Sequence, residues 1–154
     1  YSMFRANSAF NPGPNFGSTW DTSSVTDTAH MFHGASSFDP GPSFGSPWNV
    51  SKVTTMKNMF FSALAFSPGP DFGSTWVISN VIDMAGMFKG ASSFVKGYGV
   101  CSWEGTYKAG LNVLTMFDGT ASGDLDCSGV AYPSPSPSSA PSISSMPSLA
   151  TSPT

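Results

Sequence analysis

Residues 31–38 read Met-Phe-His-Gly-Ala-Ser-Ser-Phe, and this pattern returns along the chain at a fixed interval. It recurs almost unchanged at 87–94, and looser copies lie at 3–10 and 59–66. The copies start at residues 3, 31, 59 and 87, so each interval is 28 residues. A constant period of this size is typical of a protein built from stacked structural repeats.

Several other residues keep their place within the 28-residue unit. The full repeats, 3–30, 31–58 and 59–86, each hold a Pro-Gly-Pro triplet, a Phe-Gly-Ser triplet or its equivalent, and a Trp. One unit cannot bury so many apolar side chains, whereas stacked copies bury them against each other. We therefore expect a single ribbon of core made by Phe4, Phe10, Phe16, Trp20, Phe32, Phe38, Phe44, Trp48, Phe60, Phe66, Phe72, Trp76, Phe88 and Phe94.

The local pattern predicts a short helix in each unit. Val53, Met56 and Phe60 are spaced at i, i+3 and i+7, which places them on one face of a helix. Gly34 and Gly90 are expected to end such helices in the left-handed conformation. The Pro-Gly-Pro triplet forces a bend, and residues 43–50 after it are expected to pair as a short strand. The predicted fold is an α/β repeat solenoid, with a short helix plus a short strand or extended Pro-Gly-Pro segment in each coil.

The two ends of the repeat array differ. The first copy starts at Met3 without a cap, so its apolar edge is expected to be covered by upstream repeats or by another subunit. The fourth repeat, 87–115, is degenerate and lacks Pro-Gly-Pro. Cys101 and Cys127 follow the last regular repeat, outside any zinc-binding pattern. We interpret them as one disulfide that closes a cap over 101–127, with two buried free thiols as the alternative.

The composition changes near the C-terminus, so we divide the chain into a repeat solenoid at 1–131 and a tail at 132–154. Residues 133–154 contain six Pro, nine Ser and no charged residue. Such a segment cannot form a core and is expected to be extended and polyproline-like. Ser/Thr-rich segments with Pro are typical O-glycosylated stalks, and by resemblance to extensin-like wall proteins the prolines are candidates for hydroxylation. The candidates are Pro133, Ser134, Pro135, Ser136, Pro137, Ser138, Ser139, Pro141, Ser142, Ser144, Ser145, Pro147, Ser148, Thr151, Ser152, Pro153 and Thr154.

The chain shows no constellation for catalysis, cofactor binding or metal binding, and we expect none of these sites. His30 and His33 could share a metal, but His33 falls at a variable position of the repeat, where we expect exposure to solvent. Asn49 begins the sole Asn-x-Ser/Thr sequon and is a candidate for N-glycosylation. With 10% charged residues, a net charge of −3 and no basic cluster, nucleic acid is not an expected partner. No apolar run approaches the roughly 20 residues of a membrane span.

The repeat resembles that of BspA-like leucine-rich-repeat surface proteins of bacteria, mycoplasmas and protists, which reads W-D-V-S-N-V-T-D-M-S-x-M-F-x-G-A-S-S-F. Residues 20–38 and 76–94 carry this likeness, which extends over about 3–103. With its Ser/Pro-rich tail, the chain is similar to secreted versions in diatoms and related algae. The resemblance implies a leucine-rich-repeat-like coil, used for adhesion or structure at a cell surface, with no shared catalytic residues.

These features predict an extracellular, non-enzymatic structural protein, a subunit of a glycosylated filament, wall or surface appendage. Its expected partners are further copies, stacked head to tail, and glycans. The alternative is a cell-surface adhesion or recognition module, which binds a matrix or host ligand through variable positions such as Arg5, His33, Phe61 and Lys89. Ice binding is a weaker third hypothesis, because Pro47 interrupts the threonine column that would be needed.

Overall fold

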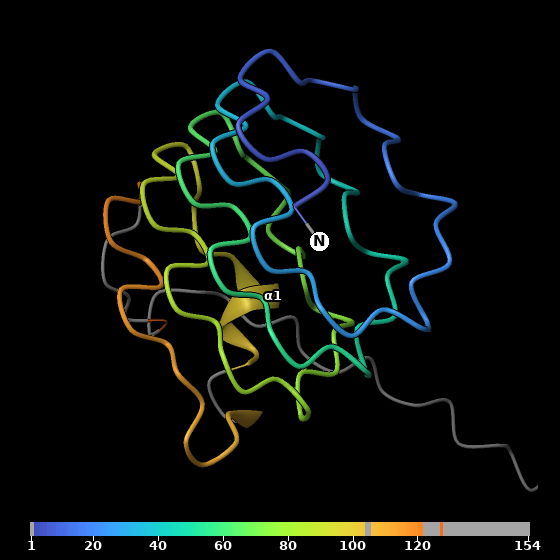
Figure 1. Ribbon diagram of the computed structural model, residues 1–154, viewed down its shortest axis with the longest axis vertical. Coiled ribbons are helices and arrows are strands. Elements are labelled where there is room, and N and C mark those ends of the chain that lie inside the picture. The colour runs from blue at the N-terminus through green and yellow to red at the C-terminus, as the bar shows by residue number, and fades with distance from the viewer. Residues whose placement is uncertain (1, 104–105, 122–126, 128–154) are drawn as a thin grey trace, which may run out of the picture.

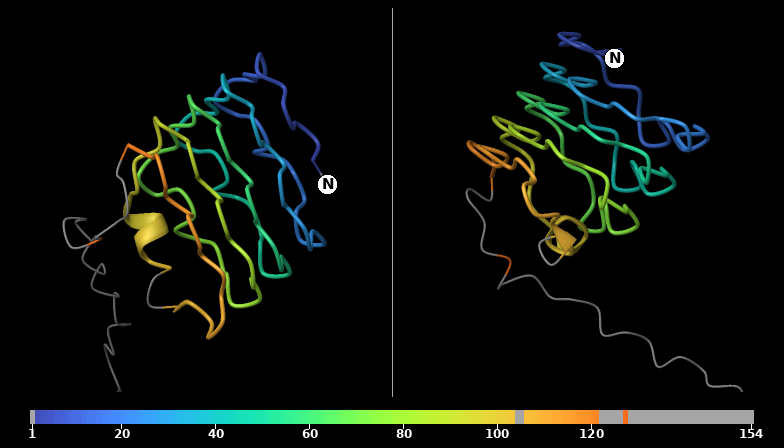
Figure 2. Two further views of the ribbon diagram at one scale, coloured as in Figure 1. Left: turned by 60° about the vertical axis from the view of Figure 1, so that its left-hand side comes forward. Right: turned by 60° about the horizontal axis from the view of Figure 1, so that its bottom comes forward.

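The computed structural model describes residues 2–103, 106–121 and 127. The chain winds into coils that lie one above the next, in chain order, from the N-terminal to the C-terminal end (Figures 1 and 2). In this part of the chain the regular elements are a single helix, α1 (Tyr98–Cys101), and isolated parallel bridges that join Asp27 to Thr55, Thr55 to Asp83, and Asp83 to Asn112. None of the described residues form a helix that is long and apolar enough to cross a membrane. The prediction of a regular repeat is confirmed.

The prediction of a helix in each coil is wrong, because alternate backbone amides bond to the next coil and those between them close three-residue turns within their own coil. Phe32 N donates to Met59 O at 2.9 Å, and Phe60 N donates to Met87 O at 2.8 Å. An α-helix needs those amides for carbonyls four residues back. Asn58, inside the expected helix, also has a φ of 52°, which a right-handed helix excludes. The segment instead makes tight bends, and each bend turns an apolar side chain such as Met56 inward.

The strand expected at 43–50 is also wrong. Phe44 N donates to Gly41 O at 3.3 Å, and Trp48 N donates to Gly45 O at 3.1 Å, so this segment makes two successive turns. Parallel pairing occurs elsewhere, along the Asp27, Thr55 and Asp83 bridges. The Pro-Gly-Pro bend overlaps the start of the first of these turns, at Gly41, which has a φ of 79°.

The core consists of aromatic columns that run along the stack. Within a coil the rings recur about every six residues, and each ring packs on its counterpart in the next coil. Phe32 stacks on Phe60 at 5.4 Å between ring centroids, and Phe60 stacks on Phe88 at 5.7 Å. Residues 112–121 add a partial last layer, in which Phe117 continues this column 5.6 Å from Phe88. The expected core residues from the second coil onward are buried: Phe32, Phe38, Phe44, Trp48, Phe60, Phe66, Phe72, Trp76, Phe88 and Phe94.

One backbone position of every coil lies in the left-handed region. It is occupied by Ala6, Gly34, Ser62, Gly90 and Gly119, with φ values of 58°, 73°, 54°, 73° and 70°. Glycine adopts this conformation freely, whereas an L-residue with a side chain pays about 1–2 kcal/mol. Gly34 and Gly90 therefore adopt the conformation expected from the sequence, although at a bend and not at a helix end. Ser62 and Ala6 are strained at the same position.

We expect Ser62→Gly to stabilise the protein and Gly34→Ala to destabilise it. The first change relieves strain at φ 54°, partly offset by the entropy that glycine adds to the unfolded chain, for a net gain of about 0.5 kcal/mol. The second imposes strain at φ 73°, where the new Cβ would find only an ordinary contact 3.5 Å from Ala6, and should cost about 1 kcal/mol. Denaturant unfolding measures both values. Changes of the same sign would contradict a shared left-handed position.

Candidate functional site

Three of the four tryptophans reach back to a glycine carbonyl in the coil before them. The indole Nε1–H groups are buried and donate at 3.0, 2.8 and 2.9 Å, in the pairs Trp48 to Gly17, Trp76 to Gly45, and Trp103 to Gly73. The same glycines lie directly under the indole rings. A Cβ on Gly45 would lie 3.0 Å from the Trp76 ring, and one on Gly73 would collide with the Trp103 ring. Glycine is therefore required wherever a tryptophan of the next coil covers the chain.

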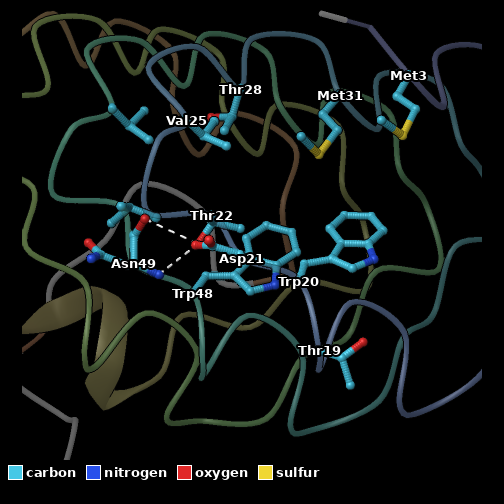
Figure 3. A pocket seen from close by; sticks show the side chains of 12 residues that line it. Met3, Thr19, Trp20, Asp21, Thr22, Val25, Thr28, Met31, Trp48 and Asn49 are labelled. Carbon is cyan, nitrogen blue, oxygen red and sulfur yellow. Dashed lines mark hydrogen bonds between the residues drawn. The ribbon is translucent and has the colours of Figure 1, made fainter.

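The N-terminal end of the stack is open. Phe4, Phe10, Phe16 and Trp20 head the aromatic columns but are only partly buried, and Met3 is 68% exposed. A cavity of about 430 Å³ lies at this end (Figure 3). Its wall is mostly apolar and consists of Met3, Thr19, Trp20, Asp21, Thr22, Val25, Thr28, Met31, Trp48, Asn49, Val50 and Val53.

The cavity exists because the first coil carries small polar residues at two core positions. Thr22 stands where the next coils have Val50 and Ile78, and Thr28 stands where they have Met56 and Met84. These four larger side chains are fully buried. Alignment of the repeats already shows both threonines at positions that are apolar in the later coils. A cavity was not predicted from this difference.

Polar groups gather at one rim of the cavity. Asn49 N donates to Thr22 Oγ1 at 2.8 Å, and Thr22 Oγ1 lies 3.2 Å from Asn49 O (Figure 3). Nearby, the side chain and then the backbone amide of Ser23 donate to Asp21, and these bonds lower the pKa of its carboxyl group. The rim therefore offers hydroxyl, carboxylate and amide groups beside an apolar interior.

Asn49, the predicted N-glycosylation residue, is exposed. Its Oδ1 accepts hydrogen bonds from Ser51 Oγ at 2.7 Å and from Ser51 N at 3.1 Å. The two polar residues of the sequon are thus held in one compact turn on the surface.

His33 is half-buried rather than fully exposed as expected, because its ring stacks on Phe61 with 4.7 Å between centroids. His30 packs beside it, 5.5 Å away between centroids. His30 Nδ1 is buried and has no hydrogen-bond partner among the described residues. Burial lowers the pKa of His30, and the nearby charges of His33, Arg5 and Lys57 lower it further, against a smaller opposing effect of Asp27. Groups of three or more potential metal-ligating side chains are absent from the described part of the chain.

The C-terminal end is closed, in contrast to the N-terminal end. Cys101 and Cys127 form the predicted disulfide, with 5.7 Å between their Cα atoms. The last aromatic side chains are covered, since Trp103 is 2% and Phe117 9% exposed. The ammonium group of Lys96, itself buried, lies 4.5 Å from the centroid of the Phe117 ring. The tail and all its predicted modification sites, 133–154, lie outside the described residues.

The comparison with protein families assigns the repeat. A family model described as "Mycoplasma protein of unknown function, DUF285" matches residues 1–129, and the chain belongs to this family. This match corrects the resemblance to BspA-like leucine-rich-repeat proteins that the motif suggested. The columns that define the repeat in space hold Phe and Trp rather than leucine. No curated protein and no solved structure matches the chain.

We expect acid to destabilise the protein through His30, and His30→Asn to reduce this effect. The folded protein binds the His30 proton less readily than the unfolded chain does. The contribution of His30 to stability is therefore complete above its unfolded pKa of about 6.5 and is lost as the pH falls through the lower folded value. Asparagine suits the backbone, because Asn58 holds the equivalent position at φ 52°. Thermal unfolding between pH 7.5 and 5 measures the slope, and an unchanged slope in the variant would refute this role.

Proposed function

We propose that the protein is an extracellular structural protein, a subunit of a glycosylated filament, wall or surface appendage that assembles by stacking of repeats. The observation that carries this proposal is the aromatic core, whose ring columns continue from one coil to the next through the same contacts. A fold of this kind adds coils through the same contacts that hold its own coils together. The disulfide supports an oxidising, extracellular setting.

The closed C-terminal end bears on the form of assembly. The head-to-tail homopolymer expected from the sequence requires two apolar ends, and the aromatic columns of this chain end under cover at Trp103 and Phe117. The geometry therefore favours stacking through a coil face other than the covered C-terminal one. In this proposal the Ser/Pro-rich segment and Asn49 carry the glycans, and the coils carry the contacts.

If this function is correct, the chain secreted from a eukaryotic host should be heavier than the 16.1 kDa of its amino acids. Intact mass spectrometry and glycopeptide mapping would place sugars on the 133–154 segment, with Asn49 as a second site. Asn49→Gln would remove only the N-linked part, and enzymatic removal of N-glycans provides a matched control. A chain with the bare mass would count against a glycosylated extracellular structural role.

A second candidate function, ligand recognition at a cell surface, has one specific observation in its favour. The variable column formed by Arg5, His33, Phe61 and Lys89 follows one side of the stack, where His33 stacks on Phe61. Lys89 Nζ lies 3.4 Å from Asp118 Oδ2, and both side chains are 41% exposed. Such an exposed pair contributes little to stability, so these residues are free to vary for binding.

For the recognition function, replacing Arg5, His33 and Lys89 together by serine should leave folding intact and reduce attachment to matrix or cell surfaces at least about tenfold, or about 1.4 kcal/mol. A microplate adhesion assay with the fluorescent protein measures attachment. A triple serine variant of the exposed residues Asn15, Lys52 and Asp71 is the control for surface substitution. Equal attachment of both variants and the unchanged chain would exclude this column as the binding site.

A further inference from the structure

Asp118 and Gly119 form the one place in the sequence where an aspartate or asparagine precedes a glycine. The backbone nitrogen of the second residue and the side-chain carboxyl carbon of the first are separated by three atoms, so a bond between them closes a five-membered ring. A side chain on the second residue hinders this approach, whereas glycine has no Cβ and moves freely in φ and ψ. The pair therefore has the composition that favours attack of the backbone on the carboxyl group.

The backbone N–H of Gly119 is unpaired within the described part of the chain. The glycines at the equivalent position donate to the following coil, Gly34 N to Phe61 O and Gly90 N to Asp118 O, both at 2.7 Å. Gly119 has the same left-handed conformation, with a φ of 70°, and is exposed. The Met-Phe-x-Gly pattern does not recur in residues 122–154. The peptide plane of Gly119 can therefore turn without the loss of a hydrogen bond.

The carboxyl group of Asp118 is also held weakly. Asp27 accepts a hydrogen bond at 2.7 Å from the backbone amide two residues on. The amide two residues after Asp118 is Thr120 N, and it donates to Phe117 O instead, at 3.1 Å. The Asp118 carboxyl group contacts the Lys89 ammonium group, with 3.4 Å between Oδ2 and Nζ, and both side chains are 41% exposed. Because an exposed ion pair contributes little, the carboxyl group is free to rotate toward the next backbone nitrogen.

The reaction of these two groups needs only water. Gly119 N loses its proton and bonds to Asp118 Cγ, and a carboxyl oxygen leaves as one water molecule, which gives a succinimide. Water then adds to one of the two ring carbonyls. Opening of the ring at Cγ restores aspartate. Opening at the former main-chain carbonyl leaves the chain linked through Cγ, and this product is isoaspartate.

We propose that Asp118–Gly119 is a site of spontaneous isoaspartate formation, and that this modification weakens the last layer of the stack. It is a chemical change that accumulates with the age of the molecule. The Lys89 ion pair is lost, because the carbon that carried Oδ2 becomes part of the main-chain amide. The inference does not depend on the proposed function, which would stand if the modification were absent.

The weakening follows from the extra atom in the main chain. Isoaspartate inserts one methylene group between Asp118 and the residues after it. The backbone bonds of those residues, from Thr120 N to Phe117 O at 3.1 Å and from Ala121 N to Phe94 O at 3.2 Å, then lose their register. The ring of Phe117 ends an aromatic column, so the change loosens the segment that covers this column.

Incubation of the full, disulfide-bonded chain at neutral pH and physiological temperature tests the site. After several weeks, labelling by a protein isoaspartate methyltransferase should rise, and peptide mapping with electron-transfer dissociation should locate isoaspartate at residue 118. A synthetic peptide with the sequence of residues 115–121 gives the rate without the fold. The folded chain should react within about tenfold of the peptide, or about 1.4 kcal/mol in activation free energy.

Two variants separate this site from the rest of the chain. Asp118→Glu keeps a carboxyl group near Lys89 but requires a six-membered ring, and Gly119→Ala shields the attacking nitrogen. Each should slow the modification at this site at least about tenfold. Alanine suits the backbone there, because Ala6 holds the equivalent position with a φ of 58°. The purified isoaspartate form of the unchanged chain should unfold at a lower denaturant concentration than fresh protein.

Three results would overturn the inference. A folded chain that reacts slower than the peptide by more than about tenfold would mean that the fold protects the site. Label that maps to another residue, or that is unchanged in both variants, would remove the assignment to Asp118. Equal unfolding midpoints of the fresh and modified chains would refute the weakening of the last layer.

Discussion

The contact of Trp48, Trp76 and Trp103 with a glycine one coil back constrains the whole stack. It combines a buried hydrogen bond from the indole N–H with a ring that lies on a residue without a side chain. Both parts fail if successive coils shift relative to each other, so the contact holds the coils in register. With the coils in register, the phenylalanine rings align into columns and the backbone amides meet carbonyls of the neighbouring coil. The fold therefore depends on exact repetition more than on regular secondary structure.

Features that depend on residue types at a fixed spacing were predicted from the sequence. The local backbone conformation within each coil was not. The 28-residue period, the ring columns and the disulfide all follow from residue types at fixed spacing. The helix does not, because Val53, Met56 and Phe60 have the spacing of a helical face and also that of successive tight bends. The partners of the amide hydrogens separate the two structures: alternate amides bond to the neighbouring coil, and the others close tight turns within their own coil. Left-handed residues such as Asn58 and Ser62 give no signal in a single copy, whereas Gly86 and Gly90 at the same positions of the next coil do.

At the candidate site, the sequence predicted an apolar edge at Met3 but not the cavity beside it. Thr22 and Thr28 were visible as weaker members of apolar columns, and the consequence, a cavity between coils, needs three dimensions. His33 was expected in solvent because its column varies, yet a variable column can still pack along itself, as the His33–Phe61 stack shows. Variation at one position of the repeat therefore shows that several residue types fit there, and it does not show that the side chain is exposed to solvent.

The left-handed positions, ring columns and tryptophan–glycine contacts all return after 28 residues in the regular coils. A gene duplication or deletion of one such unit would join a coil to a neighbour whose surface it already fits. Chains of this type can thus gain or lose whole coils without a new type of contact between coils. The number of coils is then set by the number of 28-residue units in the gene. The C-terminal end could close a stack of any length, because Trp103 meets Gly73 through the same contact that joins the regular coils.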